Sequence, residues 1–347
     1  MKAAVLEAFG EPLAIRAVPD PAPPPGGAVV RVEACGICRS DWHLWRGDLS
    51  GVTLPRIMGH EFAGVVEALD KSVTGFSVGD RVVVPFSLGD GTCELCRSGH
   101  SNICDNRISP GITADGAYAR YVAVPYANHG LIRLPENISF KDAASLGCRF
   151  MTAFHGLVDQ GELRPGEWVA IFGSGGIGLS ATNIAAGIGA LPIAVDIAAP
   201  KLDLARELGA VAVVDASKDD PVDAIREITR GGAHVAVDAL GSAATARQAL
   251  LSLRKRGRML QIGLPVAEEP AVPVPMLTLA RQELRIIGSL GMQTHRYPEL
   301  LRLVELGRLH PHKLVTGEVR LEDVSDVLRE MNDYRGVGVR VITPADA

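Results

Sequence analysis

Two groups of residues are best suited to metal chemistry, one of two cysteines and a histidine and the other of three cysteines. The first group is Cys38, His60 and Cys148, which lie far apart in the sequence. Two thiolates and a neutral imidazole balance a divalent cation, and three protein ligands with an open fourth position are typical of catalytic zinc. Such a metal acts as a Lewis acid and lowers the pKa of a bound alcohol. Alone, Cys148 could be a buried small side chain and His60 an ordinary loop histidine, so only the three residues together predict a metal site.

The second group is Cys93, Cys96 and Cys104, within the segment GDGTCELCRSGHSNIC. Core packing explains three cysteines in so short a stretch poorly. The chain has 6 cysteines, and in a reducing compartment clustered cysteines bind metal more often than they form disulfides. This group therefore predicts a closed structural zinc site whose fourth ligand is not a cysteine.

A glycine-rich loop, residues 173–178, follows the apolar run WVAIF and precedes a small-residue helix. In that setting a G-x-G-x-x-G motif lets a pyrophosphate approach a helix N-terminus. The alternative is a glycine turn in another kind of α/β enzyme. The loop residues expected to bind the cofactor are Gly173, Gly175, Gly176, Ile177 and Gly178.

An acidic residue, Asp196, ends the next predicted strand. Its carboxylate can accept both hydroxyls of an adenosine ribose and would repel a 2′-phosphate. Residues 197–199 offer no cation to offset that repulsion. The sequence therefore favours NAD over NADP, and Lys201 could add a contact near the ribose.

Composition and charge narrow the classes of protein to which this chain can belong. A length of 347 residues favours two domains, and 47% hydrophobic with 22% charged residues is typical of a globular chain. The net charge is −5, and the basic cluster 254–258 is interpreted as an exposed helix end and turn, so no nucleic-acid partner is expected. Neither a signal-peptide core nor an apolar run of about 18 residues is present, which predicts a cytoplasmic protein without membrane contact.

The elements that must position these residues fall into two classes. Up to about residue 145 the chain has short apolar runs typical of strands, at 28–37, 62–69, 80–86 and 117–125. From 146 onward strands alternate with helices, which predicts an α/β fold with a doubly wound parallel sheet. From about 290 two helices (298–307 and 321–331) and a strand (338–342) are expected to return to the first domain.

Over essentially its full length the chain resembles the zinc-containing alcohol dehydrogenases of the medium-chain dehydrogenase/reductase superfamily. The resemblance implies a β-rich GroES-like catalytic domain of residues 1–145, completed by 287–347, and a Rossmann NAD-binding domain of residues 146–286. The motifs that carry it are CGICRSDWH (35–43), GHEFAGVV (59–66), the cysteine lobe (90–104), SLGCRFMTAF (145–154), FGSGGIG (172–178) and AVD (194–196).

The resemblance also implies roles around the first metal, which Cys38, His60 and Cys148 would hold. Glu61 matches an acid that can swing toward the metal as ligands exchange. Asp41 matches the acid that orients the zinc-bound histidine and fixes its tautomer. Ser40 matches the hydroxyl that takes the proton of the alcohol, which then passes by way of the nicotinamide ribose to His43 and to solvent.

Other matched positions concern cofactor and substrate. Thr152 is expected to pack against the nicotinamide and Arg340 to lie near the pyrophosphate. The backbone of Ile262, Gly263 and Leu264 is expected to meet the carboxamide. An apolar cleft over the zinc is expected from Trp42, Trp45 and Phe86. Because Ser40 lacks the methyl group of a threonine, the cleft is expected to admit bulkier or secondary alcohols.

The structural zinc site of the family has four cysteines, and the position of the first falls on Asp90. Three thiolates and a carboxylate keep the same total charge, although the harder oxygen should bind zinc less tightly than sulfur. His100 and Asp105 are rival ligands, and a lobe without metal is the remaining alternative. Cys35 has no expected role beyond packing.

The resulting hypothesis is reversible oxidation of a primary or secondary alcohol to an aldehyde or ketone, with hydride transfer to NAD. A sorbitol-like polyol dehydrogenase or a threonine dehydrogenase is the nearest alternative, although the polyol branch tends to have an acid where this chain has Cys148. A zinc-free quinone reductase or nucleotide sensor would lack the metal ligands. A homo-oligomer is expected from the resemblance, with a tetramer favoured over a dimer.

Overall fold

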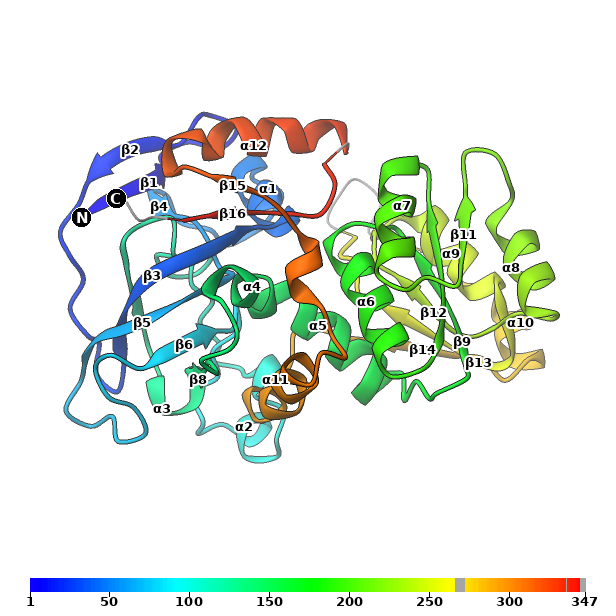
Figure 1. Cartoon of the computed structure of the whole chain (residues 1–347), viewed down its shortest axis with the longest axis horizontal. Coiled ribbons are helices and arrows are strands. Elements are labelled where there is room, and N and C mark those ends of the chain that lie inside the picture. The colour runs from blue at the N-terminus through cyan, green and yellow to red at the C-terminus, as the bar shows by residue number, and fades with distance from the viewer. Residues whose placement is uncertain (266–271, 335, 344–347) are drawn as a thin grey trace. The chain divides into compact units, whose positions relative to one another are not determined.

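The computed structural model describes residues 1–265, 272–334 and 336–343, which belong to two compact units. Unit 1 comprises Met1–Met151, Gly291–Leu306 and Pro311–Ala347, and unit 2 comprises Thr152–Leu290 and Gly307–His310. Figure 1 traces both units along the chain. The predicted α/β class is confirmed, because one unit is rich in strands and the other alternates strands with helices.

Unit 1 is built on a mixed sheet of seven strands, in the order β15-β16-β3-β5-β6-β8, with β7 also pairing with β3. A smaller sheet has the order β2-β1-β4. The larger sheet contains β3 (Ala28–Ile37), β5 (Phe62–Leu69), β6 (Arg81–Val84), β7 (Tyr121–Val124), β8 (Ile132–Arg133), β15 (Val315–Val319) and β16 (Val339–Ile342). The smaller one contains β1 (Lys2–Leu6), β2 (Ala14–Ala17) and β4 (Arg56–Ile57).

The long strand β3 organises this unit. Nearly all of its residues are buried, and it pairs antiparallel with β5, β7 and β16. Because β16 comes from the C-terminal part of the chain, that pairing joins the expected final strand to the N-terminal strands. Strand β15, which the sequence pattern did not predict, extends the sheet beyond β16 in parallel.

The helices of unit 1 are short, and several site residues lie in or next to helical segments. Helix α1 (Arg39–Arg46) begins directly after β3, with Cys38 as its N-cap and Asp41 reaching back to the Cys38 backbone in a capping box. The chain around Cys148 forms a π-helical turn, Leu146–Phe150, after α4 (Phe140–Ala144). The others are α2 (Glu94–Arg97), α3 (Ala127–Gly130), α11 (Tyr297–Glu305) and α12 (Val324–Glu330).

Unit 2 is a parallel sheet of six strands in the order β11-β10-β9-β12-β13-β14, the arrangement of a Rossmann fold. Its strands are β9 (Trp168–Phe172), β10 (Leu191–Asp196), β11 (Ala212–Asp215), β12 (Ala233–Asp238), β13 (Leu253–Gln261) and β14 (Arg285–Gly288). Its helices are α6 (Gly176–Gly187), α7 (Ala199–Glu207), α8 (Pro221–Thr229), α9 (Ala243–Leu251) and α10 (Met276–Arg281). Helix α5 (Met151–Phe154) and a second π-helical turn, His155–Gln160, precede β9.

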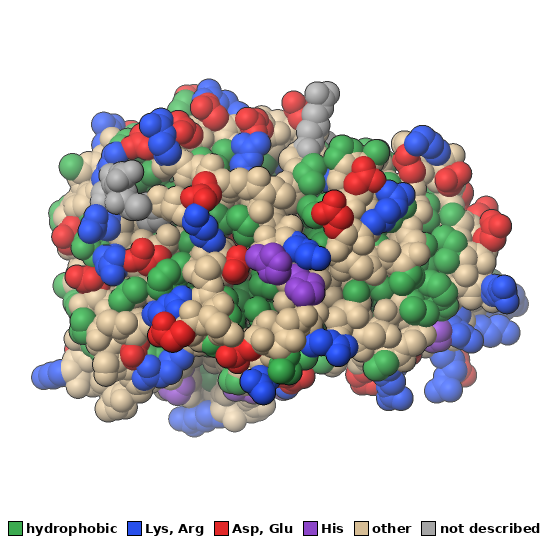
Figure 2. Space-filling view, in the orientation of Figure 1, with side chains coloured by type: hydrophobic (Ala, Val, Ile, Leu, Met, Phe, Trp, Pro, Cys, Tyr) green, Lys and Arg blue, Asp and Glu red, His purple; other side chains and the backbone are tan. Residues whose placement is uncertain are grey.

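The surface carries charged side chains of both signs, as the composition leads one to expect. Basic and acidic side chains are interspersed over most of the face drawn in Figure 2. The basic cluster 254–258 belongs to the start of β13 and its register shift against β12, not to a helix end and turn as expected. Among the described residues, no helix has the length and apolar character needed to cross a membrane.

Candidate active site and metal centres

Cys38, His60 and Cys148 come together in unit 1. Their ligand atoms all lie within 4.8 Å of one another, and all three side chains are buried. Cys38 follows β3, His60 precedes β5, and Cys148 lies in the π-helical turn. Three separate elements therefore build a site of the kind that a catalytic zinc ion occupies.

Asp41 orients the imidazole of His60. Its Nδ1 lies 2.9 Å from Oδ1 of Asp41, whose Oδ2 accepts a 2.8 Å hydrogen bond from the backbone N–H of Cys38. The other ring nitrogen, Nε2, is buried and has no hydrogen-bond partner among the described residues. A buried ring nitrogen left unpartnered beside two thiols is what a metal ligand requires, so these residues fit a zinc ion.

The charges of the cluster also favour a cation. A hydrogen bond with Cys148 lowers the pKa of Cys38 well below its ordinary value, and the same hydrogen bond, together with burial, raises the pKa of Cys148. Burial by itself would lower the pKa of His60, but the interaction with the Asp41 carboxylate raises the pKa of that imidazole above its ordinary value. A divalent cation replaces these protons, because thiolates and neutral imidazole are the ligand forms.

Behind the cysteines lies a buried ion pair between Glu61 and Arg149. Oε2 of Glu61 accepts hydrogen bonds from Nε (2.8 Å) and Nη2 of Arg149, and Oε1 accepts one of 3.1 Å from the Arg149 backbone. Burial raises the pKa of Glu61, against the effect of Arg149. Sequence reasoning missed Arg149, and its only signal was its place directly after Cys148.

Two candidate proton carriers lie on α1. Oγ of Ser40 is 3.9 Å from Sγ of Cys38, and Nδ1 of His43 is 2.8 Å from Oδ2 of Asp48. Burial lowers the pKa of His43, and the hydrogen bond with Asp48 works in the opposite direction. Asp48 was also missed, although it follows His43 by only five positions.

Of the three residues expected to line a substrate cleft, only Phe86 faces the cluster. Its ring centroid is 6.3 Å from that of His60, edge to face. Trp42 and Trp45 lie in the hydrophobic core of unit 1, and their indole N–H groups donate to Asn332 and to the Glu11 carbonyl. Their three-residue spacing puts both on the buried face of α1, which favours a core role over the expected pocket role.

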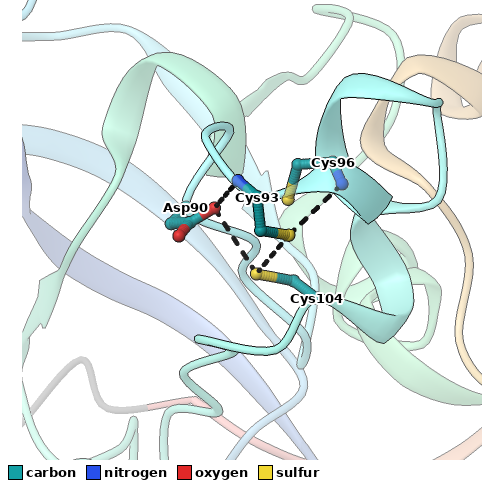
Figure 3. Close-up of side chains that lie close together, drawn as sticks. All are labelled: Asp90, Cys93, Cys96 and Cys104. Carbon is teal, nitrogen blue, oxygen red and sulfur yellow. Dashed lines mark hydrogen bonds between the residues drawn. The ribbon is translucent and has the colours of Figure 1, made fainter.

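The second cluster contains Asp90, Cys93, Cys96 and Cys104, whose ligand atoms again lie within 4.8 Å of one another. Figure 3 shows the four side chains pointing toward a common centre. Sγ of Cys93 and Cys104 are 3.7 Å apart, and Sγ of Cys104 is 3.5 Å from Oδ1 of Asp90. Neither rival ligand, His100 or Asp105, belongs to this group.

Hydrogen bonds hold the Asp90 carboxylate in place. Its Oδ2 accepts a 2.6 Å bond from Nδ2 of Asn106, and Oδ1 accepts a 2.8 Å bond from the backbone of Thr92. These bonds keep the pKa of Asp90 far below its ordinary value. Burial raises the pKa of Cys96 to about 12, so that a full set of thiolates requires a cation.

The glycine loop of unit 2 has the geometry of a phosphate-binding turn. Gly173 follows β9 with φ +93, and a Cβ at Gly178 would lie 1.8 Å from the Gly173 carbonyl oxygen. The first glycine permits the turn, and the last lets α6 begin close to the strand. Around Gly175, the N-cap of α6, a Cβ would meet nothing within 4 Å, so this backbone is open to a ligand.

Asp196 ends β10, next to β9 and the loop. Its Oδ2 accepts a 2.7 Å hydrogen bond from the backbone N–H of Ser174, and Oδ1 accepts bonds from Ile197 and Ala198. The carboxylate therefore fixes the backbone of the glycine loop.

The remaining expected cofactor residues are divided between the units. Thr152 opens unit 2 and is buried. The backbone N–H groups of Ile262 and Gly263 donate to the Asp238 carbonyl oxygen, at 3.1 and 2.8 Å, and the following Leu264 is exposed. The half-buried Lys201 lies in α7 of the same unit. Arg340 lies in β16 of unit 1, where its Nη2 is 2.7 Å from Oε2 of Glu330.

Comparison with known proteins gives a consistent result. Residues 24–136 match the alcohol dehydrogenase GroES-like domain, and residues 176–305 match the zinc-binding dehydrogenase family. The chain is 36% identical to an alcohol dehydrogenase of Geobacillus stearothermophilus over 95% of its own length and 96% of the relative. It is 34% identical to the NAD-dependent alcohol dehydrogenase of Sulfurisphaera tokodaii, over 99% and 100% of the two chains. The crystal structure of the alcohol dehydrogenase of Aeropyrum pernix matches with a TM-score of 0.90 at 32% identity, covering 99% of this chain and 100% of that one.

Proposed function

Since the chain belongs to the alcohol dehydrogenases of the medium-chain dehydrogenase/reductase superfamily, we propose that it interconverts a primary or secondary alcohol and its aldehyde or ketone with zinc and NAD. The single observation that supports the zinc dependence most strongly is at His60. Its Nε2 is buried without a partner beside Cys38 and Cys148, while Nδ1 is held by Asp41. NAD is supported by Asp196 and the glycine loop.

When bound, zinc supplies Lewis acidity toward the alcohol oxygen and NAD accepts the hydride from the carbinol carbon. The chain would hold the metal through Cys38, His60 and Cys148. Asp41 keeps the imidazole in the tautomer that binds through Nε2. Three protein ligands would leave one coordination position for the substrate oxygen.

The hydroxyl proton leaves separately from the hydride. Ser40 would take it, and the position of its Oγ, 3.9 Å from Sγ of Cys38, supports this role. His43 is suited to pass it to solvent, because Asp48 holds Nδ1 and leaves Nε2 to accept a proton. Phe86 supplies an apolar wall beside His60, and Ser40 in place of a threonine leaves room for a bulkier carbinol.

The second cluster is proposed to hold a structural zinc ion, with Asp90 as the oxygen ligand. All four ligand positions are filled by protein, so that this site has no opening for a substrate. The hydrogen bond from Asn106 occupies one carboxylate oxygen and directs the other toward Cys104.

An activity screen tests the proposal. Purified protein is assayed with primary, secondary, aromatic and polyol substrates and with both NAD and NADP, before and after removal of metal by a chelator. The expected result is NAD-linked oxidation of primary and secondary alcohols that disappears with the metal and returns with zinc. Turnover confined to ethanol-sized primary alcohols would refute the substrate range, and turnover confined to polyols would favour the sorbitol-like alternative.

A further inference from the structure

The proposed fourth position requires that no other side chain fill it. Glu61 is the obvious competitor, because it adjoins His60 in the sequence and is completely buried. Nevertheless, its carboxylate is not part of the group of ligand atoms that Cys38, His60 and Cys148 form among the described residues.

Arg149 accounts for this exclusion. Its guanidinium binds Oε2 of Glu61 through two nitrogens, and its backbone N–H binds Oε1. The same guanidinium donates a 3.1 Å hydrogen bond from Nη2 to the carbonyl oxygen of Ile37, at the end of β3. Both carboxylate oxygens are thereby occupied, and the guanidinium that occupies them is anchored to the sheet.

The surrounding backbone keeps the pair in place. At Gly36, a Cβ would lie 2.8 Å from Oε2 of Glu61 and 2.9 Å from Nη2 of Arg149. The Gly36 N–H also donates to the Glu61 carbonyl oxygen at 2.7 Å. The ion pair therefore packs directly against the backbone of β3 at Gly36, in space that any residue with a Cβ would take up.

We propose that Arg149 is a positioning residue that withholds Glu61 from the catalytic metal and so reserves the fourth position for substrate. This inference rests on the proposed function, because it requires a metal held by Cys38, His60 and Cys148. The swing of Glu61 toward the metal, which the family resemblance implies, would first have to break these contacts.

The protein loaded with Co²⁺ in place of zinc provides the test, because the visible spectrum of Co²⁺ reports its ligands. In Arg149→Met the carboxylate loses both guanidinium bonds to Oε2 and keeps only the backbone N–H bond to Oε1. We therefore expect the cobalt bands to shift and imidazole, a probe of the open position, to bind about tenfold more weakly. The double variant Glu61→Gln/Arg149→Met should restore both properties. Glu61→Gln alone should change neither, because the carboxylate is not a ligand in the native protein.

The matched control is Arg258→Met, which removes a largely buried arginine paired with Glu167 in unit 2 (Nη2 to Oε2, 2.5 Å) and should leave the spectrum unchanged. If Arg149→Met does not fold, Arg149→Lys replaces it. A lysine cannot bind Oε2 and the Ile37 carbonyl in the same way, so we expect a smaller shift in the same direction, reversed by Glu61→Gln.

Native spectra and imidazole affinity in the folded Arg149 variants, or an altered spectrum in Glu61→Gln alone, would overturn the inference. Failure of the proposed function gives a different result. In that case native protein and Cys38→Ser would have the same cobalt spectrum, because no metal would bind at the first cluster.

Discussion

Asp41 and His60 lie 2.9 Å apart (Oδ1 to Nδ1), and both side chains are 1% exposed. The same carboxylate accepts the Cys38 backbone N–H through its other oxygen. One side chain therefore sets the orientation of the imidazole and also the start of the helix that follows Cys38.

This relationship predicts the effect of Asp41→Asn. An amide is a weaker acceptor than a carboxylate, and it no longer favours the required tautomer, so we expect zinc affinity at this site to fall by about 10–100-fold. Competition with a chromophoric chelator measures the change. Asp48→Asn is the control, because Asp48 binds a histidine that is not a ligand. Native zinc affinity in Asp41→Asn would contradict the proposed role of Asp41.

Asp48→Asn has its own expected effect, on the pH dependence of alcohol oxidation. The Asp48 carboxylate raises the pKa of His43 while burial and Arg39 lower it. Without the carboxylate that pKa falls further, so the acidic limb of the kcat profile should move to lower pH. The pH-independent value of kcat should drop by at most ~10²-fold, the lower range of general acid–base effects. An unchanged profile would mean that His43 does not carry the proton.

Asp196→Ala is expected to weaken NAD binding by roughly 10–100-fold, because hydrogen bonds to a charged group contribute about 1.5–3 kcal/mol. The preference for NAD over NADP should fall at the same time, since the repulsion of a 2′-phosphate is lost. Asp196→Asn separates the two effects, because the amide retains an oxygen for Ser174 N–H but removes the charge. If both variants keep the native cofactor preference, the choice of cofactor lies elsewhere.

The geometry of the second cluster predicts how well variants of Asp90 and Asn106 retain the structural zinc. Asp90→Cys should retain the structural zinc, Asp90→Ala should lose it, and Asn106→Ala should weaken it because the carboxylate is no longer held. Zinc content and the thermal unfolding midpoint are the measurements, with alcohol oxidation recorded separately. A cluster that carries no zinc in the native protein would support the alternative of a lobe without metal.

Much of the fold could be predicted from the sequence because its patterns are local. Apolar runs mark β3 and β5, and the glycine loop with Asp196 marks a nucleotide-binding strand-turn-helix. Arg149 could not be found in this way, because its partner Glu61 is 88 positions away and only the folded π-helical turn brings the two together. Trp45 packs in the hydrophobic core of unit 1, a placement that follows from its three-residue spacing from Trp42 on α1, whereas its expected place in a substrate pocket stays a prediction.

The most direct test of the proposed zinc chemistry is the zinc content of Cys38→Ser, measured beside that of the native chain. We expect about two zinc ions per chain in the native protein and about one in the variant, with alcohol oxidation abolished and NAD binding retained. A Cys38→Ser protein that kept both its zinc and near-native activity would contradict the assignment of Cys38, His60 and Cys148 as the catalytic metal site.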